Sequence, residues 1–286
     1  MDATAAPRSA ESPLVARARG LGPLDAVAGW GPVRHAGSAA RLATFVRERA
    51  RFAAAEMLRL PGVRRYHLRD GGRPVLMRHG TIDVWVFVEL FVKRLYEPPP
   101  AVAAALERVA APLVLDLGAN IGMFGLDALT RHPGARVIAY EPEPGNAAIH
   151  RRLIELNGGG DRWRLVEACA GPRGGSVSFM AGHGPGSHIV EGHPAGSIEV
   201  PMVDVLGEIA EADLVKMDIE GGEWGILTDP RIAAAPALVL EYHPEGCPRE
   251  DTAGFATELL AGHGFDVTPI FHDAAGIGML WATRPA

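Results

Sequence analysis

The hydrophobic pattern of the chain changes character near residue 101. Beyond that point, short apolar runs of strand length alternate with stretches whose apolar residues recur at helical spacing. The runs of strand character are Leu113–Leu117, Arg136–Tyr140, Trp163–Glu167, Leu214–Met217, Ala237–Glu241, Phe265–Ile270 and Met279–Ala282. Helical patterns lie between most of them, at Ile121–Arg131, Gly145–Asn157 and Asp251–Gly262. The alternation predicts an α/β fold with a mostly parallel sheet that helices cover on both faces.

The first hundred residues follow a different pattern. Residues 1–37 are rich in Ala, Pro, Gly and Arg, which indicates a loosely structured lead-in. Apolar residues at helical spacing then run from Ser38 to a stop at Pro61-Gly62. The turn signal Asp70-Gly71-Gly72, between two short extended runs, predicts a hairpin. The next run, TIDVWVFVELFVKRLYEPPP, has the length of a helix and ends at prolines.

These patterns divide the chain in two. We predict a lead-in, helix and hairpin extension over residues 1–100 that shapes a substrate pocket or a contact in a homodimer. We predict the main ligand-binding domain over residues 101–286.

Composition narrows the classes of protein to consider. Hydrophobic content is 48% and charged content 22%, which is typical of a globular protein with a sizeable core. No apolar run approaches the roughly 20 residues that span a bilayer, and the first residues lack the features of a signal peptide. Two cysteines are too few for a disulfide framework. We therefore expect a cytoplasmic protein without a membrane partner.

The charge is distributed unevenly. The net charge of −6 argues against nucleic acid as a partner. Residues 1–100 carry a balance of +7, whereas residues 101–286 carry −13. One interpretation is a basic N-terminal layer that docks on an acidic core. The other is a basic face that attracts an anionic small-molecule acceptor, or a carrier protein that delivers one.

The stretch LVLDLGANIGMFG joins the first strand of the domain to a helix through a glycine-rich turn. In such folds the ligand lies at the carboxyl ends of the strands, against the helix N-terminus. A nicotinamide site favours Gly-x-Gly-x-x-Gly, but here Gly118 is followed by Ala119 and Asn120. Asp116 would repel a pyrophosphate, yet it can accept a hydrogen bond from an ammonium. The turn therefore favours S-adenosylmethionine, which has an ammonium and no phosphate.

A second acid supports a nucleoside ligand. The next strand ends in VIAYEPEP, which places Glu141 25 positions after Asp116. A carboxylate there can accept hydrogen bonds from both ribose hydroxyls. Because NAD would use it equally well, Glu141 indicates a nucleoside but not the methyl donor. The alternative is that Asp116 caps a helix and Glu141 is a solvated strand end.

Four motifs together resemble one family. LVLDLGANIGMFG, VIAYEPEPGNAAIHRRLIELN, LVKMDIEGGEWGIL and LVLEYH look like the FkbM-type S-adenosylmethionine-dependent methyltransferases. RHGTIDVWVFVELFVKRLYEPP is similar to the segment that precedes the first strand in that family. The resemblance covers roughly residues 75–285. It implies a Rossmann-like class I methyltransferase fold with a seven-stranded sheet, and O-methylation of small natural products or sugars.

The predicted cofactor site follows the carboxyl ends of the strands. The methionine end of S-adenosylmethionine is assigned to the turn residues Asp116, Gly118, Asn120 and Gly122. Glu141 is assigned to the ribose, and Glu167 and Ala168, at the end of the third strand, to the adenine.

Catalytic candidates come from the next two strand ends. KMDIEGGEW contributes Asp218 and Glu220, and LEYHPEG contributes His243. His243 is the favoured general base, because an unperturbed imidazole titrates near neutrality. Asp218 would orient the acceptor or the cofactor amine or assist proton removal, and Glu220 would anchor the turn. The alternative is that the acids are helix N-terminal carboxylates and that His243 caps its strand end.

A metal is the rival explanation for the same residues. Asp218, Glu220 and His243 offer oxygen and imidazole ligands to a divalent ion such as Mg²⁺, which would lower the pKa of a bound hydroxyl.

The segment MAGHGPGSHIVEGHPAGSIEV is interpreted as a mobile glycine-rich loop near the active site. Ser187 and His188 are its predicted substrate contacts. His183, His188 and His193 have a spacing that matches no metal signature. Tyr96, beside the proline stop, is a further candidate to cover the ligand.

The sequence thus predicts a methyltransferase that acts on a hydroxyl of a natural product, polyketide or sugar. Two alternatives stay open: an N- or carboxyl-methyltransferase on the same scaffold, and a non-catalytic nucleoside-binding module.

Overall fold

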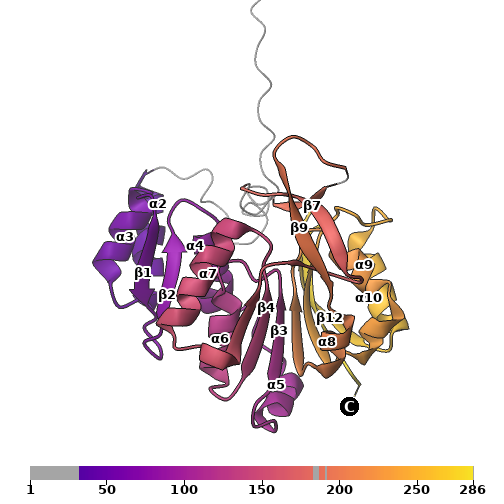
Figure 1. Ribbon diagram of the computed structural model, residues 1–286. Coiled ribbons are helices and arrows are strands. Elements are labelled where there is room, and N and C mark those ends of the chain that lie inside the picture. Colours follow the sequence, from indigo (N-terminus) through magenta and orange to yellow (C-terminus); the bar gives the residue numbers. More distant parts are fainter. Residues whose placement is uncertain (1–31, 183–186, 191, 286) are drawn as a thin grey trace, which may run out of the picture.

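A seven-stranded sheet forms the centre of the computed structural model (Figure 1). The structure describes residues 32–182, 187–190 and 192–285. The strand order is β12-β13-β11-β10-β3-β4-β5. The bounds are β3 Leu113–Leu117, β4 Arg136–Tyr140, β5 Trp163–Val166, β10 Leu214–Met217, β11 Ala237–Tyr242, β12 Asp266–His272 and β13 Gly278–Thr283. Strand β13 runs antiparallel to both its neighbours, and the other pairs are parallel. The predicted fold class is confirmed.

The strands form where the sequence has continuous apolar runs. Every residue of β3, β10 and β11 is buried, because helices cover both faces of the sheet. Buried side chains alternate between the two faces: Val114 and Val239 belong to one hydrophobic cluster, Leu115 and Leu238 to the other.

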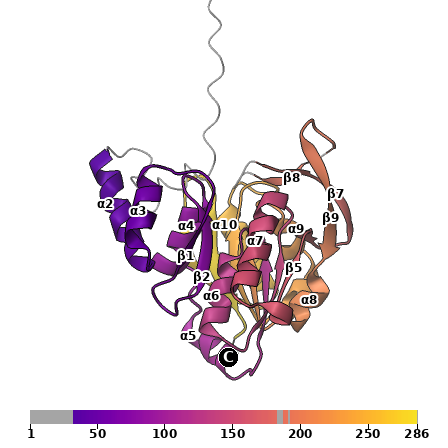
Figure 2. The same ribbon diagram turned by 60° about the vertical axis from the view of Figure 1, so that its left-hand side comes forward.

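Helices cover the two faces in two groups. One face carries α5 Pro100–Glu107, α6 Met123–Arg131 and α7 Pro144–Leu156, and the other carries α8 Leu206–Glu211, α9 Glu223–Leu227 and α10 Thr252–Gly262 (Figures 1 and 2). Single 3-10 turns lie at Gly160–Arg162 and Pro230–Ala234. None of the helices within the described ranges has the length and apolarity needed to cross a bilayer.

The glycine-rich segment after residue 180 is not simply a loop. It contributes to a second, four-stranded sheet in the order β6-β9-β7-β8, with β6 Cys169–Gly171, β7 Gly175–Met180, β8 His188–Val190 and β9 Ser197–Asp204. Strand β7 pairs with β8 and β9 in antiparallel register. The prediction of a loop across this whole segment is therefore wrong, because backbone pairing with β7 extends the chain on both sides of the glycines.

The N-terminal extension contains helices and a hairpin. The helices are α2 Pro32–Leu42, a 3-10 turn at Ala43–Phe45, and α3 Arg49–Met57. The hairpin joins β1 Val63–His67 to β2 Pro74–Arg78. The predicted single helix up to Pro61 is therefore wrong. The chain is extended at Val46, which forms an antiparallel bridge with Leu68, and this pairing interrupts the helix.

The apolar run after the hairpin forms a helix of two kinds. Helix α4 covers Asp83–Phe87, and the π-helical segment η3 continues it over Val88–Val92. The amide of Lys93 donates to the carbonyl of Val88 at 2.7 Å, which is the wider π spacing. Such π segments are frequent at functional sites.

The extension shares its core with the main domain. Phe52, Tyr66 and Phe87 belong to the same hydrophobic cluster as Val114 of β3 and Leu126 of α6. The boundary near residue 100 and the dimer contact stay predictions.

One buried ion pair fixes the start of α4. Asp83 is fully buried, and Arg78 at the end of β2 binds both its carboxylate oxygens at 2.8 Å. The backbone amide of Arg78 adds a third bond at 2.7 Å, and its guanidinium also donates to Asn146 Oδ1 of α7 at 2.7 Å. The pair therefore ties the extension to a helix of the main domain.

Removal of the guanidinium should be costly because it leaves the Asp83 carboxylate buried without its partner. We expect Arg78→Met to lower the free energy of unfolding by about 3–5 kcal/mol, measured by urea denaturation. The control is Arg249→Met, which breaks the exposed pair with Glu258 and should cost less than about 1 kcal/mol. Equal effects of the two substitutions would contradict this assignment.

Candidate active site

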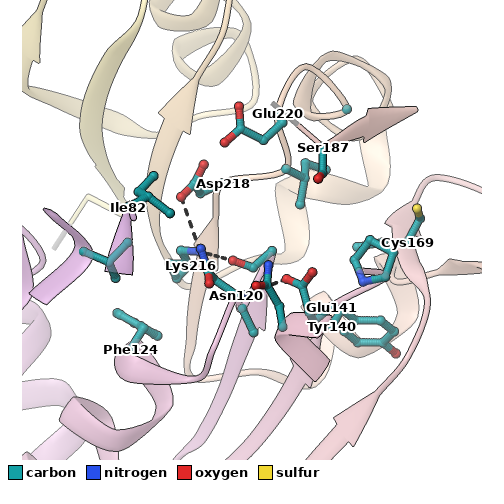
Figure 3. Close-up of a pocket in the computed structure, with 18 of the residues that line it drawn as sticks. Ile82, Asn120, Phe124, Tyr140, Glu141, Cys169, Ser187, Lys216, Asp218 and Glu220 are labelled. Carbon is teal, nitrogen blue, oxygen red and sulfur yellow. Dashed lines mark hydrogen bonds and ion pairs between the residues drawn. The ribbon is translucent and has the colours of Figure 1, made fainter. Parts of the chain in front are cut away.

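A pocket opens at the carboxyl ends of β3, β4 and β10, where the order of the strands reverses beside β3. Its space, counted out to the mouth, is ≈ 1020 Å³. The walls come from the turn after β3, the ends of β4 and β10, the small sheet, and the α4–η3 segment of the extension (Figure 3).

The glycine turn after β3 lies directly against the turn after β10. Gly118 has φ +77°, and a Cβ there would stand 1.7 Å from the carbonyl oxygen of Asp218. Asn120 adopts φ 50° without being glycine. Gly118 and Asn120 line the pocket, whereas Gly122 opens α6 and packs against His150.

Glu141 stands at the end of β4 and lines the pocket. Its side chain accepts hydrogen bonds from the amide of Asn120 at 2.7 Å and from the amide of Glu143 at 2.9 Å. Burial raises the pKa of Glu141 to about 7, although the two amides favour the ionised form. The carboxylate therefore links the glycine turn to β4 and keeps accepting capacity for a ligand.

Asp116 does not reach the pocket, contrary to the predicted contact with the cofactor. It is fully buried in β3, and its register partner Lys216 of β10 lines the pocket instead. The Lys216 ammonium lies 3.5 Å from Asp116 Oδ1 and 3.6 Å from Asp218 Oδ2, and it donates to the carbonyl of Gly118 at 2.6 Å. Burial raises the pKa of the Asp116 carboxyl, and the Lys216 charge opposes that rise.

The two residues predicted to contact the adenine do not line the pocket. Strand β5 ends at Val166, so Glu167 faces solvent and pairs with Arg151, and Ala168 is buried outside the pocket lining. Cys169 and Ala170 line the pocket instead.

His243 lies at the centre of four carboxylates. Its Nδ1 is 3.0 Å from Glu223 Oε1, and its Nε2 is 3.5 Å from Glu220, 3.6 Å from Glu241 and 3.9 Å from Asp218. Burial alone would lower the pKa of the imidazole, but the surrounding carboxylates raise it well above its usual value.

The predicted role of His243 as a free base therefore does not fit this arrangement. The surrounding carboxylates favour the charged form of the imidazole, which is 3% exposed, and Asp218 and Glu220 line the pocket in front of it. Burial and the neighbouring carboxylates raise the pKa of Glu220 to about 8.

Two of the predicted substrate residues, Ser187 and Tyr96, line the pocket. The Tyr96 hydroxyl lies 3.5 Å from Glu241 Oε2. His188 is exposed, because alternate residues of β8 face opposite sides, and Ile189 lines the pocket instead.

The three-histidine arrangement does not form a cluster that the structure describes. His183 lies outside the described residues, and His193 bonds to the Ser178 hydroxyl at 2.6 Å. A different group does come together: ligand atoms of Asp218, Glu241 and His243 lie within 4.8 Å of one another. This group contains Glu241 where the set predicted from the sequence had Glu220.

Several lining residues had escaped sequence reasoning. The α4–η3 segment and α6 contribute Ile82, Val86, Glu89, Leu90 and Phe124. The one signal in the sequence was Glu89, an acid within an otherwise apolar run of helix length.

Comparison with known proteins identifies relatives. The model of the methyltransferase FkbM domain matches residues 116–267. The 31-O-demethyl-FK506 methyltransferase FkbM of Streptomyces tacrolimicus is 29% identical over 255 residues, which cover 74% of this chain and 89% of that protein. The 2-O-methyltransferase NoeI of Sinorhizobium fredii is 36% identical over 90 residues, which cover 32% of this chain and 35% of NoeI.

Two further proteins are similar to this chain. The AMB antimetabolite synthetase AmbE of Pseudomonas aeruginosa is 29% identical over 243 residues, covering 64% of this chain. The match spans only 11% of AmbE, as it spans about a third of NoeI. The crystal structure of an S-adenosylmethionine-dependent methyltransferase from Agrobacterium tumefaciens has 16% identity and a TM-score of 0.48, covering 79% of this chain and 71% of that one.

The raised pKa of Glu141 predicts how stability depends on pH. Because the folded protein binds this proton more tightly than the unfolded chain, the free energy of unfolding should fall as the pH rises from 4.5 to about 7. The difference is on the order of 3 kcal/mol. Urea unfolding of the wild type and Glu141→Gln across this range measures it, because the variant lacks the titrating group.

Glu155→Gln, at an exposed position of α7, controls for the loss of one negative charge. A constant stability difference between the wild type and Glu141→Gln from pH 4.5 to 8 would show that Glu141 titrates normally.

Proposed function

Because the chain belongs to the FkbM family of S-adenosylmethionine-dependent methyltransferases, we propose that it methylates a hydroxyl group of a small-molecule acceptor. The observation that carries this proposal is the pocket beside the strand reversal, with Glu141 at one end and Asp218 and Glu220 at the other. Two relatives, FkbM and NoeI, are named as methyltransferases of an oxygen. A natural product, polyketide or sugar is the acceptor class we propose.

The pocket suits a cationic nucleoside. Glu141 would accept bonds from the ribose hydroxyls, and Cys169 and Ala170 would border the adenine. Among the described lining residues Lys216 is the only basic side chain, so it is the candidate partner for the methionine carboxylate. Gly118 and Asn120 would place backbone groups against the methionine end. When bound, S-adenosylmethionine supplies an electrophilic methyl group on a sulfonium.

The chain's own part in the reaction is to align the acceptor and remove its proton. The acceptor hydroxyl must lie in line with the methyl and close to a group that takes its proton. Asp218 and Glu220 line the pocket, so Asp218, or Glu220 above its raised pKa of about 8, can accept the proton while the new oxygen–carbon bond forms and the sulfur–carbon bond breaks. His243, held as a cation behind them, would stabilise their ionised form.

The charge of the lining favours some acceptors over others. Glu89, Glu141, Asp218 and Glu220 line the pocket against the single ammonium of Lys216. This negative field would repel an anionic acceptor. The lining therefore does not favour the anionic or carrier-tethered acceptor, which stays a prediction. A protonated amine would be attracted, which makes N-methylation the second candidate. The non-catalytic alternative is set aside by membership of an enzyme family.

Loss of the Glu141 charge should weaken cofactor binding. We expect Glu141→Gln to bind S-adenosylmethionine and S-adenosylhomocysteine about ten- to a hundredfold more weakly, because hydrogen bonds to a charged acceptor contribute about 1.5–3 kcal/mol. Isothermal titration calorimetry measures the change, with Glu155→Gln as the control and NAD as a ligand that should not bind. Unchanged affinity in Glu141→Gln, or binding of NAD alone, would refute the cofactor assignment.

The proposed acceptor class is tested by measuring which compounds the enzyme methylates. Pairs of compounds that differ only by hydroxyl or amine at one position, on sugar and polyketide scaffolds, are incubated with S-adenosylmethionine and analysed by mass spectrometry. We expect methylated product from hydroxyl compounds, and its loss by roughly a hundredfold or more when Asp218→Asn and Glu220→Gln are combined. Product from the amine member of each pair alone would instead establish N-methylation.

A further inference from the structure

The carboxyl ends of β10 and β11 bring imidazole and carboxylate ligand atoms together. His243 Nε2 lies 3.6 Å from Glu241 Oε1 and 3.9 Å from Asp218 Oδ1, and the three side chains offer atoms within 4.8 Å of one another. Neighbouring ligands of one octahedral cation lie roughly 3 Å apart. Small side-chain rotations would therefore place these three atoms around a single ion.

The imidazole is anchored from its other side. Glu223 is fully buried and accepts from the backbone amides of Ile219 and Gly221 at 2.9 Å each. Its Oε1 lies 3.0 Å from His243 Nδ1, so Nε2 is turned toward Asp218 and Glu241. A carboxylate behind a histidine is the usual support of a metal-binding imidazole, since it fixes both tautomer and orientation.

The cluster contains more carboxyl groups than basic groups. Ion pairs connect Lys216 and His243 to five carboxyl groups, those of Asp116, Asp218, Glu220, Glu223 and Glu241. Buried charges are normally paired or coordinate a metal, because an unmatched charge away from water is costly. A divalent cation would offset this excess within the site.

The pocket provides an independent indication of a polar ligand here. Asp218, Glu220 and Tyr96 line it, and the Tyr96 hydroxyl contacts Glu241, so the pocket borders the cluster on two sides. The Ser187 side chain lines the same pocket at 8% exposure, and among the described residues its hydroxyl has no hydrogen-bond partner. A buried hydroxyl without a partner indicates that the space is built for a ligand with polar groups.

We propose that Asp218, Glu241 and His243 Nε2 hold a divalent cation of the Mg²⁺ and Mn²⁺ class, which displaces the proton from Nε2 into solvent, with Glu223 as the positioning residue. Two carboxylates with one imidazole favour such ions over the softer metals that thiolates select. The inference rests on the proposed function and deepens it. The cation would bind the acceptor oxygen and lower the pKa of its hydroxyl, so that the proton passes to Glu220 or water. The oxygen–methyl bond then forms as the sulfur–methyl bond breaks.

Mn²⁺ binding tests the site directly. Full-length protein is treated with EDTA, dialysed, saturated with S-adenosylhomocysteine and titrated with Mn²⁺, and bound ion is followed by electron paramagnetic resonance and calorimetry. We expect one ion per chain, displaced by Mg²⁺. Glu241→Gln should weaken Mn²⁺ binding at least tenfold, and Glu223→Gln about ten- to a hundredfold, as for other carboxylates that orient a metal-binding histidine. Glu250→Gln, exposed on the same loop, should change nothing.

Melting temperatures provide a second measurement, which is needed if a variant binds Mn²⁺ poorly for another reason. Without metal, Glu241→Gln should melt no lower than the wild type, because it removes one charge from a repulsive cluster. Mn²⁺ should raise the melting temperature of the wild type but not of this variant. Two results together would show that the cluster consists of ion pairs alone. Metal-free Glu241→Gln would melt well below the wild type, and Mn²⁺ would leave the melting temperature of the wild type unchanged.

The two proposals can fail separately. Binding of S-adenosylhomocysteine without binding of Mn²⁺ overturns the metal site and leaves the proposed function intact. Failure of S-adenosylhomocysteine to bind would overturn the proposed function, whatever the result with Mn²⁺. Binding of Mn²⁺ that Glu241→Gln and Glu223→Gln leave unchanged would place the ion elsewhere and overturn the inference.

Discussion

The buried ammonium of Lys216 holds together the part of the fold on which the pocket depends. It lies between Asp116 of β3 and Asp218 after β10, and it donates to the carbonyl of Gly118. The two turns at these strand ends pass so close that only glycine fits at residue 118. Because the charge is buried with its partners, the relative position of the turns is fixed by electrostatics as well as by packing. The backbone groups that face the pocket are thereby set in place before any ligand arrives.

A second set of polar contacts connects the N-terminal extension to this frame. Arg78 binds the buried carboxylate of Asp83 and the side chain of Asn146, and Asn146 itself lines the pocket beside Glu141. Glu141 in turn accepts from the amide of Asn120 in the glycine turn. The extension is therefore part of the site: it fixes the start of α4, and α4 with the π-helical segment η3 forms one wall of the pocket. A charged residue there, Glu89, faces the same space as the acids of the main domain.

The site brings several carboxyl groups together, which changes the pKa values of its residues and favours cationic ligands. Carboxylates around His243 raise the pKa of its imidazole, and burial together with the neighbouring carboxylates raises the pKa of Glu220, so neither group behaves as it would in water. The same charges would attract a sulfonium, and they are arranged with an imidazole in the manner of a cation site. Both consequences follow because the carboxyl ends of the neighbouring strands β10 and β11 bring these side chains together. The basic character of residues 1–100 does not extend to this pocket, where Lys216 is the only basic side chain among the described lining residues.

The sequence by itself determined the order of the strands along the chain, the glycine turn, and the family. The predicted strand runs matched β3, β4 and β10 to the residue, because strands covered by helices on both faces are built mostly of apolar side chains. Only the tertiary structure decided which side chains reach the ligand. Strand alternation turned His188 outward, the end of β5 left Glu167 in solvent, and the register of β3 with β10 buried Asp116 beneath Lys216. The state of His243 likewise could not be predicted from its own motif. The sequence showed the acids of the Asp218 segment and Glu241 at the next strand end, but not that four of these carboxylates converge on one imidazole, since electrostatic effects depend on distances that packing alone sets.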